Sequence, residues 1–212
     1  MAAYEYYAHY PDGYDARGER VWPLLLTLHG AGERDVTLDA LSRHHYYLST
    51  YALTAARYPC IVVVPHCPPR HYWEPDKIES LLTGLLLTER ADADRIYLTG
   101  FSMGGYGAWF TAGCYPGRYA AIAPVCGGGD VRDARKLAGL PIWAFHGALD
   151  QVVPVEETLA MIDAIENVGG HPRLTIYPEG DHGVWDQTFA NPELYAWFLS
   201  QQRGKAQGKV AA

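Results

Sequence analysis

The sequence has no cluster of basic residues, no long apolar run and few cysteines. Its 17 lysines and arginines are outnumbered by 24 aspartates and glutamates, which gives a net charge of -7, so we expect no nucleic-acid or anionic-membrane surface. No apolar stretch approaches the roughly 18 residues that a membrane-spanning helix needs. The first residues lack the basic segment and apolar run of a signal peptide. We therefore expect a cytoplasmic protein, or a secreted one whose leader has been removed.

Four cysteines occur in 212 residues, and no two of them form a Cys-x-x-Cys pair. A disulfide framework is not expected in a chain of this length, so we interpret them as mostly buried thiols, with Cys67 nearest a cleft. His66, Cys67 and His71 are close in sequence but lack the paired spacing of a zinc site. We therefore predict neither a metal nor a cofactor.

Apolar runs of strand length alternate with segments of helical periodicity throughout the chain. Hydrophobic residues make up 49% of the sequence and charged residues 19%, as in a globular protein with a full core. Strands are expected at 4–10, 23–28, 60–65, 96–99, 119–125, 141–146 and 173–177, and helices at 39–58 with Asp39 as N-cap, 76–90, 155–168 and around 194–199. This alternation predicts an α/β fold, a mostly parallel central sheet with helices on both faces and no lid domain. We expect one domain over residues 1–203 and a flexible tail at 204–212.

The segment 97–107 has the pattern of a strand, a sharp turn and a helix, with Gly100-x-Ser102-x-Gly104 at the turn. This is the pattern of a nucleophile elbow, in which a strained backbone projects a serine hydroxyl into a cleft. Side chains two residues before and after the serine would collide, and glycine removes that clash. The helix that follows directs its first N–H groups toward the serine. We therefore predict Ser102 as a nucleophile; the alternative is a glycine-rich turn with an inert serine.

Two further residues follow predicted strands and give the chain order Ser, Asp, His. Because the carboxyl ends of parallel strands meet at one edge of a sheet, Asp150 and His182 are expected near Ser102. In this hypothesis His182 takes the serine proton and later returns it to the leaving group, while Asp150 orients the imidazole. Asp181 and Asp186 are the competing acids. Asp181 is disfavoured because neighbours on a loop rarely point their side chains together.

An oxyanion that forms on the substrate needs N–H donors that are already in position. One is predicted at Met103, the start of the elbow helix, and the other at Ala31, in the glycine-rich loop after the 23–28 strand. His29 and His146 each end a predicted strand, and we interpret them as structural residues that hold their loops.

Three residues are candidates for the substrate pocket: Gly32, Trp73 and Trp185. For the two tryptophans the alternative is ordinary aromatic packing. The run Gly127–Gly129 lacks the Lys-Ser/Thr ending of a phosphate-binding loop, so we interpret it as a tight turn that lines the cleft.

Three segments together resemble the α/β-hydrolase superfamily: residues 28–34 (LHGAGER), 100–109 (GFSMGGYGAW) and 145–150 (FHGALD). More narrowly, the chain resembles small serine esterases related to phospholipase/carboxylesterases, dienelactone hydrolases and polyhydroxybutyrate depolymerase-like esterases. Some members of that group carry the label predicted peptidase. The resemblance covers nearly the whole chain. The loop 66–73 departs from the family pattern, so the resemblance does not define the substrate pocket.

The resemblance implies a triad of Ser102, Asp150 and His182, with Ala31 and Met103 at the oxyanion hole. It implies a cofactor-independent serine esterase that hydrolyses short-chain carboxylic esters, small molecules that reach an open cleft, through an acyl-enzyme on Ser102. A serine peptidase or an acyltransferase on the same triad, and a ligand-binding protein that has lost catalysis, are the alternatives. The oligomeric state does not follow from the sequence.

Overall fold

The computed structural model describes residues 3–43 and 59–204, and seven strands of these residues form one sheet. The strands are β1 (Tyr6–His9), β2 (Trp22–Leu28), β3 (Ile61–Pro65), β4 (Ala91–Phe101), β5 (Ala121–Val125), β6 (Trp143–Gly147) and β7 (Arg173–Tyr177). Their order is β1-β3-β2-β4-β5-β6-β7. Only β1 pairs antiparallel, with β3, and every other neighbouring pair is parallel. The predicted mostly parallel sheet is confirmed.

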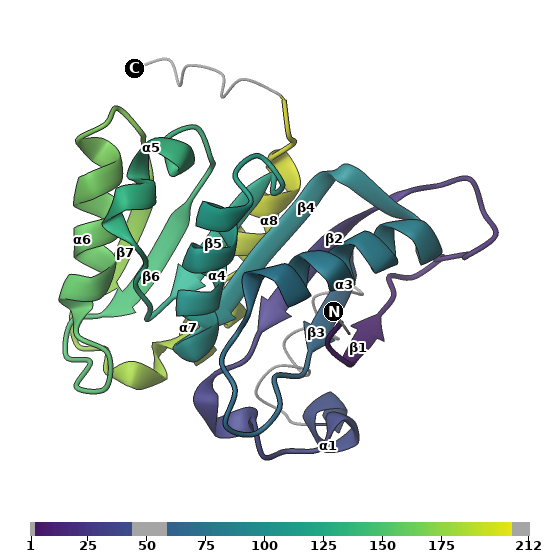
Figure 1. Ribbon diagram of the computed structural model, residues 1–212, viewed down its shortest axis with the longest axis horizontal. Coiled ribbons are helices and arrows are strands. Elements are labelled where there is room, and N and C mark those ends of the chain that lie inside the picture. Colours follow the sequence, from purple (N-terminus) through teal and green to yellow (C-terminus); the bar gives the residue numbers. More distant parts are fainter. Residues whose placement is uncertain (1–2, 44–58, 205–212) are drawn as a thin grey trace.

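Helices cover both faces of this sheet (Figure 1). They are α1 (Leu38–Arg43), α3 (Pro75–Thr88), α4 (Met103–Cys114), α5 (Ala134–Leu137), α6 (Val155–Glu166), α7 (Trp185–Ala190) and α8 (Pro192–Ser200), with short 3-10 helices η1 (Ala31–Glu33), η2 (Val131–Asp133) and η3 (His182–Val184). The buried side chains form two clusters, one with α3, α4, α5 and α6 against the sheet and one with α7 and α8. None of the described helices combines the length and the apolar character that crossing a bilayer requires.

Two expected boundaries were wrong. The strand β4 begins at Ala91 rather than 96, because its polar first half is satisfied by an Arg95–Asp92 ion pair of 2.7 Å and by Arg203, whose guanidinium lies 2.9 Å from Asp94 Oδ1. The helix α1 begins at Leu38, so Asp39 lies in its first turn rather than at its N-cap.

The hydroxyl of Thr37 accepts the N–H of Ala40 at 3.2 Å and is the capping group of α1 instead. The rest of the helix expected at 39–58, with His44 and His45, lies outside the described residues from position 44 onward. The tail expected at 204–212 lies outside them from position 205 onward.

The strand register brings several loops to one edge of the sheet. Leu28 at the end of β2 pairs with Gly100 on β4, and Phe101 pairs with Val125 at the end of β5. Val125 in turn pairs with Phe145 on β6. Since these pairs align the carboxyl ends of parallel strands, the loops that carry Ser102, Asp150 and His182 emerge side by side.

Candidate active site

Ser102 lies in a strained turn between β4 and α4, with φ 55° and ψ −116°. Its N–H donates to the carbonyl of Val125 at 2.9 Å, which ties the turn to β5. A Cβ on Gly100 would overlap the carbonyl of Gly104, and a Cβ on Gly104 would overlap the carbonyl of Leu28. The two glycines therefore allow β2, β4 and α4 to approach closely enough for the serine to project from the sheet edge.

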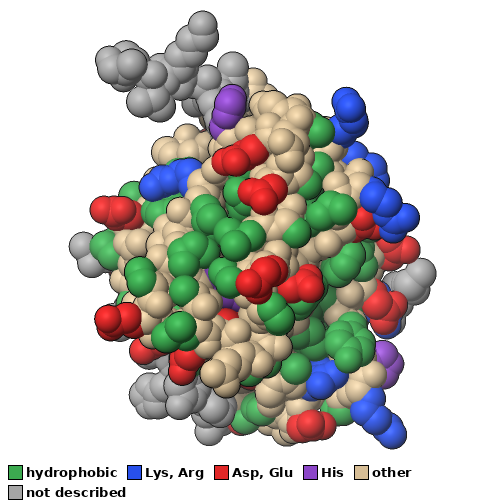
Figure 2. All heavy atoms as spheres, turned by 90° about the vertical axis from the view of Figure 1, so that its left-hand side faces the viewer, with side chains coloured by type: hydrophobic (Ala, Val, Ile, Leu, Met, Phe, Trp, Pro, Cys, Tyr) green, Lys and Arg blue, Asp and Glu red, His purple; other side chains and the backbone are tan. Residues whose placement is uncertain are grey.

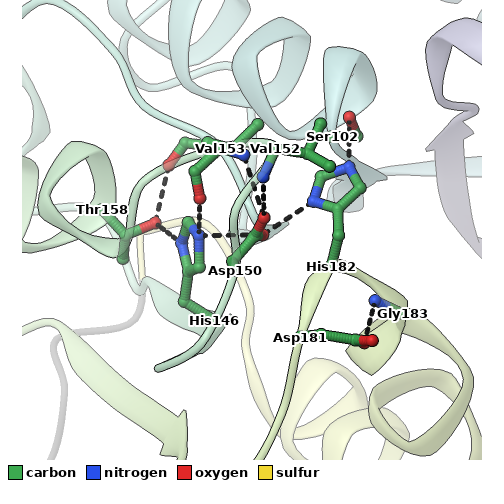
Figure 3. Close-up of polar contacts among 10 residues, drawn as sticks. Ser102, His146, Asp150, Val152, Val153, Thr158, Asp181, His182 and Gly183 are labelled. Carbon is green, nitrogen blue, oxygen red and sulfur yellow. Dashed lines mark hydrogen bonds and ion pairs between the residues drawn. The ribbon is translucent and has the colours of Figure 1, made fainter.

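The hydroxyl of Ser102, the ring of His182 and the carboxylate of Asp150 form one hydrogen-bonded chain (Figure 3). Ser102 Oγ lies 2.9 Å from His182 Nε2, and His182 Nδ1 lies 2.7 Å from Asp150 Oδ2. The carboxylate is fully buried and the imidazole is 21% exposed. Because a carboxylate can only accept, Nδ1 carries the proton and Nε2 presents its lone pair to the serine hydroxyl.

Asp150 is held as an anion by backbone donors as well as by His182. Its Oδ1 accepts the N–H groups of Val152 and Val153, both at 2.9 Å. Burial raises the pKa of the carboxyl, but the His182 hydrogen bond and these two N–H groups outweigh it, so the pKa lies below its usual value. The group therefore stays ionised at neutral pH.

The two competing acids lie elsewhere in the structure. The carboxylate of Asp181 caps η3 by accepting the N–H of Gly183 at 2.8 Å, and Asp186 lies in the first turn of α7. A Cβ on Gly147 would overlap the carbonyl oxygens of Gly180 and Asp181, so the loops after β6 and β7 are in direct contact. That contact brings the residue after Asp181, rather than Asp181 itself, to the Asp150 carboxylate.

His29 is fully buried beneath the loop that follows β2. Its Nε2 accepts the N–H of Cys67 at 3.0 Å, Nδ1 donates to the carbonyl of Gly30 at 2.7 Å, and its own carbonyl accepts Trp73 Nε1–H at 3.0 Å. Burial lowers the pKa of His29 to about 4. His29 is therefore a neutral residue that holds three segments together, in agreement with the structural role inferred from sequence.

The loop after β2 also lies against the start of α4. A Cβ on Gly104 would come within 2.9 Å of the carbonyl oxygen of His29, and one on Gly30 would lie 3.3 Å from the ring of Phe101. Ala31 begins η1 in this loop and Met103 begins α4. The first N–H groups of a helix have no partner within it, and this applies to both residues.

An apolar groove of about 640 Å³ begins at Met103, next to Ser102, and runs along α4. Its lining comes from α4, from the segment before α3 and from the first residue of α3: Tyr72, Trp73, Pro75, Met103, Tyr106, Gly107, Phe110 and Cys114. Of the three residues proposed for the pocket, Trp73 is among the lining residues, while Gly32 and Trp185 are not. Trp185 packs on Phe101 at a ring distance of 6.1 Å, and Phe101 packs on His182 at 4.8 Å.

Sequence reasoning placed the wrong cysteine near the cleft. Cys67 is fully buried in the core under His29, whereas Cys114, at the last residue of α4, is exposed and lines the groove. The groove residues of α4 recur at intervals of three and four from Met103, which is the helical period. That stripe, which starts beside the nucleophile motif, is the signal that could have identified the groove.

One face of the protein agrees with the acidic balance of the sequence. Figure 2, which views the side of α6 and β7, shows apolar and acidic side chains across the middle of that face, with lysines and arginines toward its rim. This face therefore offers no concentrated basic patch for a polyanion.

A family model described as phospholipase/carboxylesterase matches residues 76–194, more than half of the chain. The chain belongs to the phospholipase/carboxylesterase family. The match spans the serine turn, the Asp150 loop and the His182 loop, and it confirms the resemblance seen in the sequence segments. No curated protein matches the chain.

Solved structures support the same α/β-hydrolase fold. A thermostable esterase superposes with a TM-score of 0.79 at 31% identity, over 93% of this chain and 59% of its own. A putative dienelactone hydrolase from Klebsiella pneumoniae gives 0.70 at 18% identity, over 92% of each chain. The feruloyl esterase module from Clostridium thermocellum gives 0.68 at 16%, over 88% of this chain and 82% of its own. The chain thus spans little more than half of the thermostable esterase, and the last two likenesses concern the fold alone.

Proposed function

We propose that the protein is a serine esterase that hydrolyses short-chain carboxylic esters through an acyl-enzyme on Ser102. The observation that carries the proposal is the hydrogen-bonded chain from Ser102 through His182 to Asp150, with distances of 2.9 and 2.7 Å. These distances suit proton transfer without rearrangement. Membership of the phospholipase/carboxylesterase family and the 31% identity to a thermostable esterase support an ester as the substrate.

In the proposed reaction, His182 Nε2 accepts the Ser102 proton as Oγ bonds to the ester carbonyl carbon. Collapse of the tetrahedral intermediate breaks the carbon–oxygen bond to the alcohol, which leaves with the proton from His182. Water then repeats the sequence on the acyl-enzyme and releases the acid. Throughout, anionic Asp150 holds the Nδ1 proton and stabilises the imidazolium that forms twice per turnover.

The negative oxygen of each intermediate needs donors that are aligned beforehand. We propose the backbone N–H groups of Met103 and Ala31, which begin α4 and η1 against one another at the serine turn. Loss of one such donor typically lowers turnover on the order of 10²–10³-fold. The positive end of the α4 helix dipole also stabilises the negative oxygen in this proposal.

The groove along α4 supplies a preference for one part of the ester. It is lined by aromatic and apolar groups, and the indole of Trp73 is fixed by its hydrogen bond to the His29 carbonyl. Because we propose a short acyl group, the apolar group that fills such a groove belongs to the alcohol. The preferred substrates are therefore short-chain esters of bulky apolar or aromatic alcohols.

The test measures hydrolysis of p-nitrophenyl acetate and butyrate by the wild type and by Ser102→Ala between pH 5 and 9. We expect the variant to lose turnover, and an alkyl fluorophosphonate to add its mass to the wild type alone. Ser200→Ala is the matched control, since Ser200 is an exposed serine whose hydroxyl donates to the Trp197 carbonyl at the end of α8. Equal rates in the wild type and Ser102→Ala would refute the proposal, and faster cleavage of a matched anilide would favour a peptidase.

A further inference from the structure

The ring of His146 is fully buried near the end of β6, and both of its nitrogens face oxygen atoms (Figure 3). Nδ1 lies 2.8 Å from Thr158 Oγ1 on α6. Nε2 lies 2.9 Å from the carbonyl oxygen of Val153 and 3.3 Å from Asp150 Oδ2. The charge state of this ring therefore depends on which of these oxygens can donate a proton.

None of these three oxygen atoms has a proton to donate to His146. The carbonyl of Val153 and the ionised carboxylate of Asp150 are acceptors only. Thr158 has a single hydroxyl proton, and Oγ1 donates it to the carbonyl of Gly127 at 2.6 Å. Turning that proton toward His146 would leave two oxygen lone pairs facing one another across 2.6 Å. Each nitrogen of His146 must therefore supply the hydrogen of its own bond.

A neutral imidazole cannot meet this requirement, because it carries one N–H and one lone pair. In a neutral ring, one nitrogen lone pair would face an oxygen lone pair at a site that water does not reach, which is strongly unfavourable. We propose that His146 is a buried imidazolium cation, paired with Asp150, so that the carboxylate is shared between two histidines. The protonation state stands on these contacts alone, and its effect on catalysis rests on the proposed function.

The groups that face His146 from the neighbouring elements are consistent with one anion and one cation. The Cys126 thiol, in the loop after β5, lies within 4.8 Å of the His146 and Asp150 ligand atoms. Burial raises the pKa of Cys126, so the thiol stays neutral. On the far side of Asp150, η3 contributes His182. Next to His146 itself, α6 contributes the uncharged Thr158, and Ile176 on β7 pairs with His146.

The same three side chains, Cys126, His146 and Asp150, are close enough to hold a metal ion. A metal, however, needs an unprotonated histidine nitrogen and binds a thiolate. Both nitrogens of His146 are already directed at acceptors, and the thiol is neutral. The contacts therefore favour a cation on the ring over a cation bound by it.

The proposed imidazolium of His146 should affect the proposed reaction through Asp150. A positive charge beside Asp150 offsets part of the carboxylate field that favours protonation of His182. Removing that charge leaves the field uncompensated, and the pH dependence of the reaction should change with it. We expect the acid limb of kcat/KM to move upward by about one pH unit when His146 becomes neutral. If His146 merely filled space, its substitution would change the rate at every pH and leave the midpoint of the acid limb unchanged.

The first test is nuclear magnetic resonance of the wild type with ¹⁵N-labelled histidine, with His146 assigned through its contacts to Thr158. We expect two bonded protons on the His146 ring at pH 8, one on each nitrogen, in a protein to which no metal has been added. One unprotonated nitrogen would overturn the proposal, as would loss of one of the two N–H signals on adding zinc at pH 8. This readout needs no turnover, so it stays decisive even if Ser102→Ala proves to be fully active.

The second test changes the partner rather than the histidine. Thr158→Val removes the acceptor of the Nδ1 proton, and we expect it to abolish one N–H signal and to raise the acid limb of kcat/KM. Thr158→Ser keeps the hydroxyl and should restore both signals and the wild-type midpoint. If the Thr158→Val protein folds but keeps both N–H signals and the wild-type midpoint of the acid limb, the assignment of His146 as an imidazolium is contradicted.

Discussion

Two buried histidines, His29 directly after β2 and His146 near the end of β6, differ in the partners that surround them. His29 meets one donor and one acceptor, the N–H of Cys67 and the carbonyl of Gly30, so a neutral ring satisfies both nitrogens. His146 meets acceptors at both nitrogens and, by our proposal, is charged. Both side chains are fully buried. The comparison indicates that the character of the partners, more than burial, decides the charge of an interior histidine.

The two histidines also support different halves of the site. The carbonyl of His29 fixes the indole of Trp73, which forms one wall of the apolar groove. The ring of His146 contacts both Asp150 and the Val153 carbonyl, which belong to the turn that carries the proposed acid. Changes on the His146 side should therefore affect proton transfer, and changes on the His29 side should affect folding and substrate preference.

The largest effect is expected from Asp150→Asn, on the His146 side. An amide in place of the carboxylate favours the wrong tautomer of His182 and no longer stabilises its imidazolium, so kcat should fall on the order of 10³–10⁴-fold. The same change removes the counter-charge of His146, which should then lose one N–H proton. Steady-state kinetics with p-nitrophenyl butyrate and the histidine spectrum measure the two effects.

The matched control is Asp181→Asn, which keeps an oxygen to cap η3. We expect it to stay within about twofold of the wild-type kcat, as surface changes usually do. A kcat of Asp150→Asn within tenfold of the wild type would show that the buried carboxylate is not the acidic member of a catalytic triad. The difference between His29 and His146 would then have no consequence for catalysis at Asp150.

A smaller effect is expected on the His29 side, in the pH dependence of stability. The folded-state pKa of about 4 lies below the unfolded value near 6.5, so the unfolded chain binds more protons between these values. The stabilisation from neutral His29 is therefore complete above about pH 6.5 and is lost as the pH falls toward 4. It amounts to about 3 kcal/mol across that window.

Urea unfolding at pH 7 and pH 4.5 measures this contribution. His29→Gln should be less stable than the wild type at pH 7 but should lose less stability on acidification. His71→Gln, at an exposed histidine, is the control and should follow the wild type at both pH values. Identical pH dependence in His29→Gln and the wild type would mean that His29 is not the neutral histidine described above.

Local patterns were sufficient for the sheet and for the serine turn. Buried apolar runs predicted the strands because a parallel strand covered on both faces has few polar residues. The Gly100-x-Ser102-x-Gly104 spacing predicted the turn because the clash that Gly100 avoids is with Gly104, four residues along the chain, although the clash that Gly104 avoids is with Leu28 on β2. The order of Asp150 and His182 followed from the rule that functional loops meet at the carboxyl edge of such a sheet.

Features that depend on contacts between distant segments did not follow from the sequence. The acceptor for His146 Nδ1 comes from Thr158, whose hydroxyl is oriented in turn by Gly127. Nothing in the local sequence around either residue indicates this relay. Cys67 was wrongly expected near a cleft for the same reason, since only the three-dimensional structure places its N–H under His29.

The smallest effect is expected from Cys114→Phe, which narrows the groove at its far end. Cys114 lies eleven residues beyond Met103 on α4, about 16 Å along the helix axis. Because the residue is exposed, the larger side chain can enter the groove without disturbing the core. We expect kcat/KM for dodecyl acetate, whose extended alcohol chain is long enough to reach Cys114, to fall about tenfold, the scale typical of a changed apolar contact, and that for ethyl acetate to stay within about twofold.

The control is Leu87→Phe, which adds an aromatic ring to an exposed position on α3 that is not part of the groove lining. It should leave both esters unaffected. Equal losses for the two esters in Cys114→Phe would argue against the groove as a binding site for the alcohol group. A loss confined to p-nitrophenyl dodecanoate would assign the groove to the acyl chain instead, because in that substrate the acyl chain is the group long enough to reach Cys114. Either result would separate the groove from the proton chemistry at Asp150, since neither change alters a partner of His146 or His182.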